Sequence, residues 1–293
     1  MTIRPRRSAL YAPGSNARAL DKARTLPTDV VIVDLEDAVA PEAKPAAREQ
    51  AAAAILAGGF GDRELVIRVN SLATDWGHAD IAAAARSGAH AILVPKVSTP
   101  GDVMMAAAEL RKSGAPDSMR VWVMMETPMA ILNADSIVRV ARDPAARLDA
   151  LVMGTNDLAK ETRARITPGR AALVPWLAIC VAAARAYGAD LLDGVYGAIN
   201  DIEGLRAECV QARDMGMDGK TLIHPDQIEA CNETFTPDPR ELEWARKLVA
   251  AFDAPENAAK GAIALDGRMV ERLHADIARR NLDIAAAIAR KMV

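Results

Sequence analysis

Aromatic residues are scarce in this chain of 293 residues, at only 3% of the sequence. Hydrophobic residues nevertheless make up 51%, so alanine, valine, leucine and isoleucine must fill the core. Channels for single-stranded nucleic acid use aromatic side chains as stacking platforms, and carbohydrate grooves depend on them as well. The composition therefore argues against both kinds of binding protein.

An excess of charge and a long apolar run are missing as well. The 36 Lys and Arg residues nearly balance the 39 Asp and Glu residues, for a net charge of −3. A nucleic-acid binder carries a basic face, so we expect no nucleic-acid partner. No run approaches the ~18 apolar residues of a membrane span, and residues 1–14 lack the apolar stretch of a signal peptide. We expect a soluble, cytoplasmic protein with no membrane partner.

Cysteine is rare and irregularly spaced. The three cysteines are Cys180, Cys209 and Cys231, and no CxxC occurs. An odd number of widely separated cysteines in apolar surroundings is typical of buried thiols in a reducing compartment. We therefore expect neither a disulfide framework nor a zinc site.

Short apolar runs and helical patterns alternate along the first 225 residues. The apolar runs lie at residues 8–14, 30–37, 64–70, 91–97, 121–127, 150–157, 189–196 and 219–225. The helical patterns between them lie at 18–26, 44–57, 77–87, 102–112, 131–142, 170–187 and 201–215. Such runs suit strands buried on both faces, as in a parallel sheet. Eight strand–helix units predict an α/β fold, a (β/α)8 TIM barrel over residues 1–230. The alternative is a doubly wound open sheet, but no GxGxxG follows the first strand.

The pattern changes in residues 231–293. Residues 239–252 read as an amphipathic helix, and Asp266-Gly267 between two apolar runs is typical of a hairpin turn. A last helix is expected over 271–291. This extension exceeds what closes a barrel, so we expect a lid that covers the barrel mouth or packs on a neighbouring subunit.

Polar residues gather where the predicted strands end, the edge at which TIM barrels carry their active sites. They are Asp34, Glu36, Asp37, Arg68, Asn70, Lys96, Glu126, Asn156, Asp157 and His224. Arg68 interrupts an apolar run, and an unpaired buried charge is costly, so it requires an anionic partner. Asp157 could instead cap a helix, and Glu126 could pair with a lysine.

Taken together, these residue types favour a divalent metal site. Mg²⁺, or Mn²⁺ in its place, takes one or two carboxylates and keeps other positions for water and substrate oxygens. No His or Cys spacing suggests zinc. An arginine beside the metal can bind a carboxylate through two hydrogen bonds. The combination suits chelation of a 2-oxo or 2-hydroxy acid.

Seven motifs in order resemble those of the HpcH/HpaI aldolase and citrate lyase β-subunit superfamily. They are LYAPGS (10–15), VDLEDAVAPEAK (33–44), IRVN (67–70), PKV (95–97), METP (125–128), MGTNDLA (153–159) and GKTLIHPDQ (219–227). The likeness is greatest to the malyl-CoA lyase, malyl-CoA thioesterase and citramalyl-CoA lyase branch. It implies a (β/α)8 barrel that assembles as a homotrimer or hexamer.

The resemblance also assigns roles around the metal. Glu126 and Asp157 match the Mg²⁺ ligands, and Glu36 and Asp37 match carboxylates that reach the metal through water. Arg68 matches the arginine that anchors the substrate carboxylate and polarises its carbonyl.

Other matching positions would contact the acyl-CoA substrate. The backbone at Thr155 and Asn156 would touch the substrate carboxylate. Coenzyme A contacts are expected at Tyr11, Lys22, Lys96, Ile223 and His224. Asn16 stands where the family commonly has an arginine, which removes one expected phosphate contact.

The expected reaction is carbon–carbon cleavage of a 3-hydroxyacyl-CoA thioester to acetyl-CoA and a 2-oxo acid. Lyases of the family carry an aspartate in the lid as acid and base, and Glu271 takes that position here with one more methylene. A shift of about 1 Å can cost ~10²-fold in rate, so malyl-CoA hydrolysis is an alternative. Glu271 could also be a helix N-terminal charge that the helix dipole favours. A citrate lyase β-type subunit acting on citryl-acyl-carrier protein, an aldolase acting without coenzyme A and a non-enzymatic scaffold are further alternatives.

Overall fold

The computed structural model describes residues 4–257 and 259–291. Eight parallel strands form a closed barrel in chain order, with β8 paired to β1. The strands are β1 (Ser8–Pro13), β2 (Val30–Asp34), β3 (Glu64–Arg68), β4 (Ala91–Val94), β5 (Arg120–Met125), β6 (Leu148–Met153), β7 (Asp190–Asp193) and β8 (Gly219–Leu222). This closure confirms the predicted (β/α)8 architecture over the open sheet.

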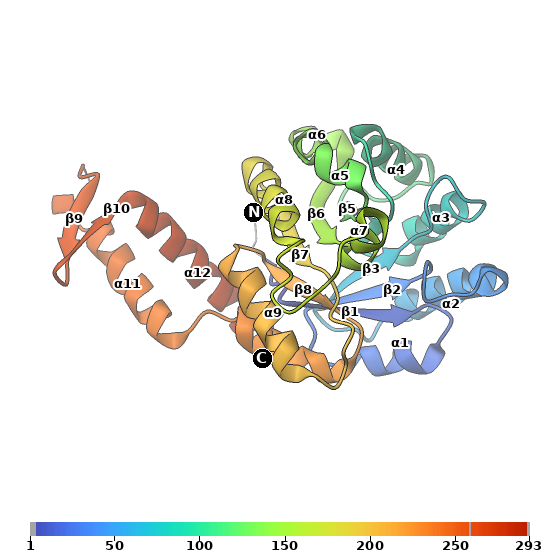
Figure 1. Cartoon of the computed structure of the whole chain (residues 1–293), viewed down its shortest axis with the longest axis horizontal. Coiled ribbons are helices and arrows are strands. Elements are labelled where there is room, and N and C mark those ends of the chain that lie inside the picture. The colour runs from blue at the N-terminus through green and yellow to red at the C-terminus, as the bar shows by residue number, and fades with distance from the viewer. Residues whose placement is uncertain (1–3, 258, 292–293) are drawn as a thin grey trace. The chain divides into compact units, whose positions relative to one another are not determined.

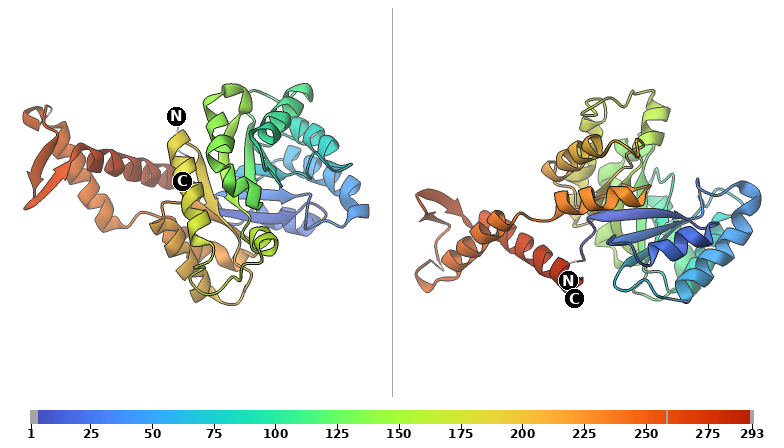
Figure 2. Two further views of the ribbon diagram at one scale, coloured as in Figure 1. Left: turned by 45° about the horizontal axis from the view of Figure 1, so that its top comes forward. Right: turned by 90° about the horizontal axis from the view of Figure 1, so that it is seen from below.

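Helices lie outside these strands, as both views in Figure 2 show. They are α1 (Ala17–Ala23), α2 (Lys44–Leu56), α3 (Gly77–Ser87), α4 (Pro100–Lys112), α5 (Pro128–Leu132), α6 (Ala134–Arg139), α7 (Thr155–Thr162), α8 (Val174–Tyr187), α9 (Ile202–Asp214) and α10 (Ile228–Phe235). Gly88 and Gly188 end α3 and α8 with φ values of 83° and 75°. This left-handed conformation is the usual glycine cap of a helix C-terminus.

The barrel interior determines which side chains reach its mouth. Ile32, Val66 and Trp122 are fully buried inside the barrel. Side chains two residues apart on a strand point to the same face. Asp34 therefore follows Ile32 inward, Arg68 follows Val66, and Glu126 follows Trp122 and Met124. Because side chains alternate between the two faces of each strand, these three charged side chains all point inward at the same end of the barrel.

One predicted strand end is a helix instead. Asn156 and Asp157, which we expected at the end of the sixth strand, lie in the first turn of α7. Strand β6 ends at Met153, and Gly154 precedes the helix. An acidic residue in a first helical turn is favoured by the helix dipole, so Asp157 has a structural role beside any chemical one.

A second compact unit, distinct from Arg6–Phe235, contains the described residues 236–257 and 259–291 together with Arg4 and Pro5. It contains α11 (Pro239–Asp253), β9 (Ala262–Leu265), β10 (Arg268–Glu271) and α12 (Arg272–Lys291), all labelled in Figure 1. Asp266 and Gly267 both have positive φ, as the predicted hairpin turn requires. The division falls after Phe235 rather than at 230, because α10 packs against α9, β1 and β8.

The expectation of buried cysteine thiols is confirmed. Cys180, Cys209 and Cys231 are free and buried. Among the described residues, no helix is long and apolar enough to cross a membrane.

Candidate active site

A cavity of about 400 Å³ opens at the carboxyl ends of the barrel strands. It is lined by Tyr11, Pro13, Asp34, Asp37, Ala38, Arg68, Met124, Glu126, Met153, Gly154, Thr155, Asn156, Asp157, Val195, Thr221 and Ile223. Residues predicted from six different motifs thus share one space, which is the arrangement expected of a TIM-barrel active site.

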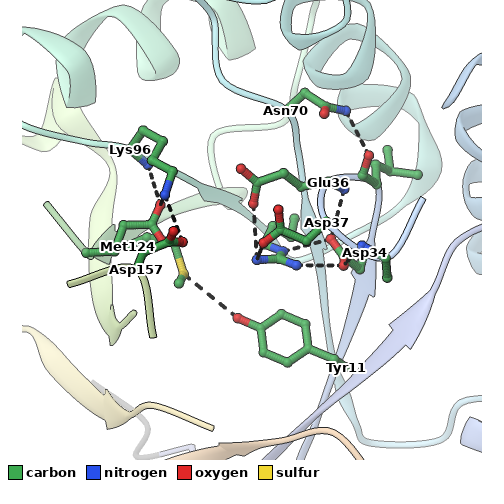
Figure 3. Close-up of polar contacts among 12 residues, drawn as sticks. Tyr11, Asp34, Glu36, Asp37, Asn70, Lys96, Met124 and Asp157 are labelled. Carbon is green, nitrogen blue, oxygen red and sulfur yellow. Dashed lines mark hydrogen bonds and ion pairs between the residues drawn. The ribbon is translucent and has the colours of Figure 1, made fainter. Parts of the chain in front are cut away.

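Arg68 is surrounded by carboxylates on strand β2 and the segment after it. Its Nε and Nη2 donate to the two oxygens of Asp34 at 2.7 and 2.6 Å. Its Nη1 lies 3.1 Å from Glu36 and 3.2 Å from Asp37, and Figure 3 shows these contacts. Arg68 is only 8% exposed. Burial opposes the shift, but Asp34 and Glu36 raise the pKa of Arg68 further above its ordinary range. The expected anionic partners are confirmed.

Asp34 was among the polar residues expected at the strand ends, but the sequence assigned it no role. Besides holding Arg68, its carboxylate accepts the backbone N–H groups of Glu36 and Ala38 at 2.9 and 3.0 Å. It therefore fixes both the arginine and the segment that carries Glu36 and Asp37. The sequence signal for this role is its spacing on β2: Asp34 is two residues after Ile32, so both side chains point into the barrel.

Glu126 and Asp157 are joined through Lys96. The Lys96 backbone N–H donates to Glu126 Oε1 at 2.7 Å. The Lys96 ammonium lies 2.7 Å from Asp157 Oδ2 and 3.7 Å from Glu126 Oε1. Lys96 adopts φ of 56°, a left-handed conformation that is uncommon for residues other than glycine and clusters at functional sites. We expected Lys96 to contact the substrate, and the structure makes it the link between two carboxylates.

Burial makes two of these acids hard to ionise. Burial raises the pKa of Glu126 to about 7, and the nearby Asp157 carboxylate adds to the shift while Lys96 opposes it. Burial likewise raises the pKa of Glu36 to about 8, although Arg68 pulls in the other direction. Strongly perturbed acids in a cleft are typical of functional sites.

Gly154 makes room for Glu126. A Cβ at this position would lie 2.3 Å from Glu126 Cβ and 2.7 Å from its Oε2. The end of β6 can therefore approach the end of β5 only with glycine here. Sequence reasoning missed this residue, although a glycine between a strand and an acidic helix start is a usable signal.

The donor set suits a hard divalent cation. Glu126 and Asp157 supply two carboxylates, and Mg²⁺ is commonly held by one or two of them. Within residues 4–257 and 259–291, no three His, Cys, Asp or Glu side chains form a metal-binding group, so zinc-type ligation is not indicated. A cation between Glu126 and Asp157 would relieve the cost of burying their charge.

Five predicted residues are absent from the cavity lining. Two of them, Glu36 and Lys96, pair with the lining residues Arg68 and Asp157. The other three are Lys22, His224 and Glu271. Lys22 is exposed in the last turn of α1. His224 caps a short 3₁₀ helix, where its Nδ1 accepts the Asp226 N–H at 3.3 Å. Glu271 ends β10 in the second unit. The roles suggested for them remain predictions.

The model of the HpcH/HpaI aldolase/citrate lyase family matches residues 7–225. The chain belongs to this family. Its members include a (3S)-malyl-CoA thioesterase of Cereibacter sphaeroides that is 48% identical over 285 residues, covering 97% of this chain and 96% of the relative. Citrate lyase subunit beta of Escherichia coli is 31% identical, with 94% and 92% covered.

A solved structure of this family supports the fold. CitE of Mycobacterium tuberculosis, in complex with magnesium, acetoacetate and coenzyme A, superposes with a TM-score of 0.73 at 28% identity. The comparison covers 98% of this chain and 100% of that one. The fold is therefore that of a citrate lyase β-like barrel.

Proposed function

We propose that this protein is a Mg²⁺-dependent enzyme that cleaves a malyl-CoA-type 3-hydroxyacyl-CoA thioester. The observation that carries the proposal is the single cavity in which Arg68 faces the Glu126–Asp157 pair. One end of such a substrate has a carboxylate beside an oxygenated carbon, and an arginine next to a cation site matches that end. Relatives that act on malyl-CoA and a relative crystallised with magnesium and coenzyme A support the choice.

The chain's own residues would bind and orient this substrate. Glu126 and Asp157 would hold Mg²⁺, which supplies Lewis acidity to the substrate oxygens when bound. Arg68 would pair with the substrate carboxylate, and Asp34 keeps the guanidinium in one orientation through two hydrogen bonds. Lys96 would balance the remaining negative charge of Asp157.

Hydrolysis of the thioester is the favoured reaction. The thioesterase relative is 48% identical, against 31% for the citrate lyase subunit. In hydrolysis, water adds to the thioester carbonyl, the C–S bond breaks, and a carboxylate and a free thiol leave. Glu271 in place of a lyase aspartate supports the same choice.

Carbon–carbon cleavage is the second candidate, and it was our first expectation from the sequence. The substrate hydroxyl loses its proton, the bond to the neighbouring carbon breaks, and a 2-oxo acid leaves. A lid carboxylate, at Glu271 in this chain, would return a proton to the acetyl-CoA enolate. The family's lyase members support this reaction.

A product assay separates the two reactions. The protein is mixed with Mg²⁺ and malyl-, methylmalyl-, citramalyl- or citryl-CoA, and the 2-oxo acid and free thiol are measured separately. Thiol without glyoxylate from malyl-CoA supports hydrolysis, and glyoxylate supports the lyase. No turnover of any of the four would refute the proposal and favour a protein-bound acyl carrier as the substrate.

We also propose a homotrimeric or hexameric assembly that works in the cytoplasm. The three free, buried thiols support a reducing compartment. The second unit supports assembly, because its size exceeds what the barrel requires for closure.

A further inference from the structure

Tyr11 lies on the floor of the active-site cavity rather than at its rim. It is on β1, two residues after the interior residue Ala9, and it packs against the barrel interior. Its ring stacks on the Arg68 guanidinium, with 4.9 Å from the Arg68 Cζ to the ring centroid. The ring therefore helps to orient the arginine.

The Tyr11 hydroxyl extends across the barrel mouth to strand β5. It faces Met124 Sδ at 3.8 Å, as Figure 3 shows. Met124 is two residues before Glu126 on the same inward face. The Tyr11 ring thus contacts Arg68, while its hydroxyl points towards the strand that leads to Glu126.

This hydroxyl has a poor partner. A thioether is a weak hydrogen-bond acceptor. The chain's other two tyrosines, Tyr187 and Tyr196, each donate to an aspartate, Asp135 and Asp201 respectively. Within the part of the chain that the structure describes, Met124 Sδ is the hydroxyl's only hydrogen-bond partner. Buried polar groups normally have a good partner, so this hydroxyl can donate to a ligand oxygen in the cavity.

The Tyr11 hydroxyl also keeps its proton. Burial raises the pKa of Tyr11 well above its ordinary value, and the neighbouring carboxylates of Asp34 and Glu126 raise it further. The group is therefore a hydrogen-bond donor under all physiological conditions.

We propose that the Tyr11 hydroxyl is the second donor, beside Arg68, to the acid end of the substrate. The ligand class it selects is a small carboxylate with an oxygen on the adjacent carbon. The substrate carboxylate pairs with Arg68. The oxygen on the adjacent carbon accepts a hydrogen bond from the Tyr11 hydroxyl and faces the Glu126–Asp157 pair. This inference rests on the proposed function, since it names a binding contact of the same site.

The test is Tyr11→Phe, which removes the hydroxyl and keeps the ring over Arg68. Oxalate, a planar ligand with adjacent carboxylates, is titrated calorimetrically into both proteins at saturating Mg²⁺. Because Tyr11→Phe loses a hydrogen bond to a charged ligand, we expect its affinity for oxalate to be about tenfold or more below that of wild type. The melting temperature should not fall, because the lost hydroxyl has no strong partner in the protein.

Tyr187→Phe is the matched control. It removes a tyrosine hydroxyl that bonds Asp135 on α6, outside the cavity, and oxalate affinity should stay at the wild-type value. Equal oxalate affinity in Tyr11→Phe and wild type, or no saturable oxalate binding to wild type, would overturn the inference.

Failure of the inference and failure of the proposed function give different results. Turnover of a CoA thioester by wild type, with equal oxalate affinities, removes only the Tyr11 contact. Weaker oxalate binding in Tyr11→Phe without turnover of any CoA thioester removes only the proposed reaction.

Discussion

At the scale of single residues, the active site is a set of charges that stabilise one another. Arg68 would be costly alone in the barrel, and Asp34 would be equally costly without it. Two hydrogen bonds in a fork geometry join them. Removing either partner would leave a buried charge, so conservative substitutions give the clearer experiment.

Arg68→Lys tests the fork geometry. Lysine keeps the charge but cannot donate two parallel hydrogen bonds to a carboxylate. We expect kcat/KM for the thioester to fall by about 100-fold or more, because displacing a substrate-binding group by about 1 Å can lower the rate by that factor. Arg185→Lys, at the partly exposed pair with Asp218, should retain wild-type kcat/KM. Full activity of Arg68→Lys would contradict the anchoring role.

The raised pKa of Glu36 predicts how the free energy of unfolding of the metal-free protein depends on pH. Its pKa is about 8 when folded and near 4.5 in the unfolded chain, so the folded state binds more protons between these values. The stability this proton provides is present below pH 4.5 and lost as pH rises towards 8. We expect a decline of a few kcal/mol at most, since one pKa unit corresponds to about 1.4 kcal/mol.

Urea unfolding in EDTA, from pH 4.5 to 8.5, measures this decline. Glu36→Gln cannot ionise and should flatten the slope. Glu49→Gln, at an exposed position on α2, should leave the slope unchanged. A slope that is identical in wild type and Glu36→Gln would show that the Glu36 carboxyl ionises normally.

At the scale of elements, the close approach of β5 and β6 brings together the residues of the proposed cation site. Met125 pairs with Met153, and the Gly154 N–H donates to the Met125 carbonyl at 3.1 Å. Glu126 directly follows the end of β5, and Gly154 directly follows the end of β6. Helix α7 begins at the residue after Gly154. Asp157 reaches the site from this helix because the turn between strand and helix is so short.

Gly154→Ala should disrupt this junction. Its Cβ would lie within 2.7 Å of two Glu126 atoms, so Glu126 or the start of α7 must move. We expect Mn²⁺ affinity, measured by calorimetry, to fall by about tenfold or more, because small displacements of ligands are costly. The matched control is Gly197→Ala, where a Cβ meets nothing within 4 Å. Wild-type Mn²⁺ affinity in Gly154→Ala would show that Glu126 is not a ligand.

At the scale of the whole molecule, the predicted chemistry is divided between two units. Residues 6–235 carry Arg68 and the Glu126–Asp157 pair, and residues 236–293 carry Glu271. The second unit has its own small core, which includes Ala245, Leu248, Phe252 and Val270. A catalytic residue on a separate unit can serve its own barrel or that of another copy.

A mixing experiment distinguishes these arrangements. Arg68→Lys and Glu271→Gln are each expected to lower thioester cleavage. If Glu271 acts on a neighbouring barrel, mixed oligomers formed after mild dissociation contain some sites with both native residues. Activity should then reappear above the sum of the two variants. No recovery, with subunit exchange verified by native mass spectrometry, would place Glu271 at the barrel of its own chain.

Much of the molecule was predictable because its signals are local. The eight apolar runs and the Asp266-Gly267 turn depend on neighbouring residues alone, and both predictions are confirmed. The short helix α7 was missed because an apolar run leads straight into its acidic first turn. The role of Asp34 and the need for glycine at 154 were not predicted, because both arise only when another strand packs beside them.

The sequence by itself determined the barrel, the family and the set of charges at the strand ends, since strand period and motif order carry that information. Only the tertiary structure decided how those charges pair. It placed Asp34 against Arg68, Lys96 between Glu126 and Asp157, and the Tyr11 hydroxyl against sulfur. These contacts join residues far apart in the chain. Their partners depend on the closed circle of eight strands, which brings β1, β3 and β5 to face one another across the barrel mouth.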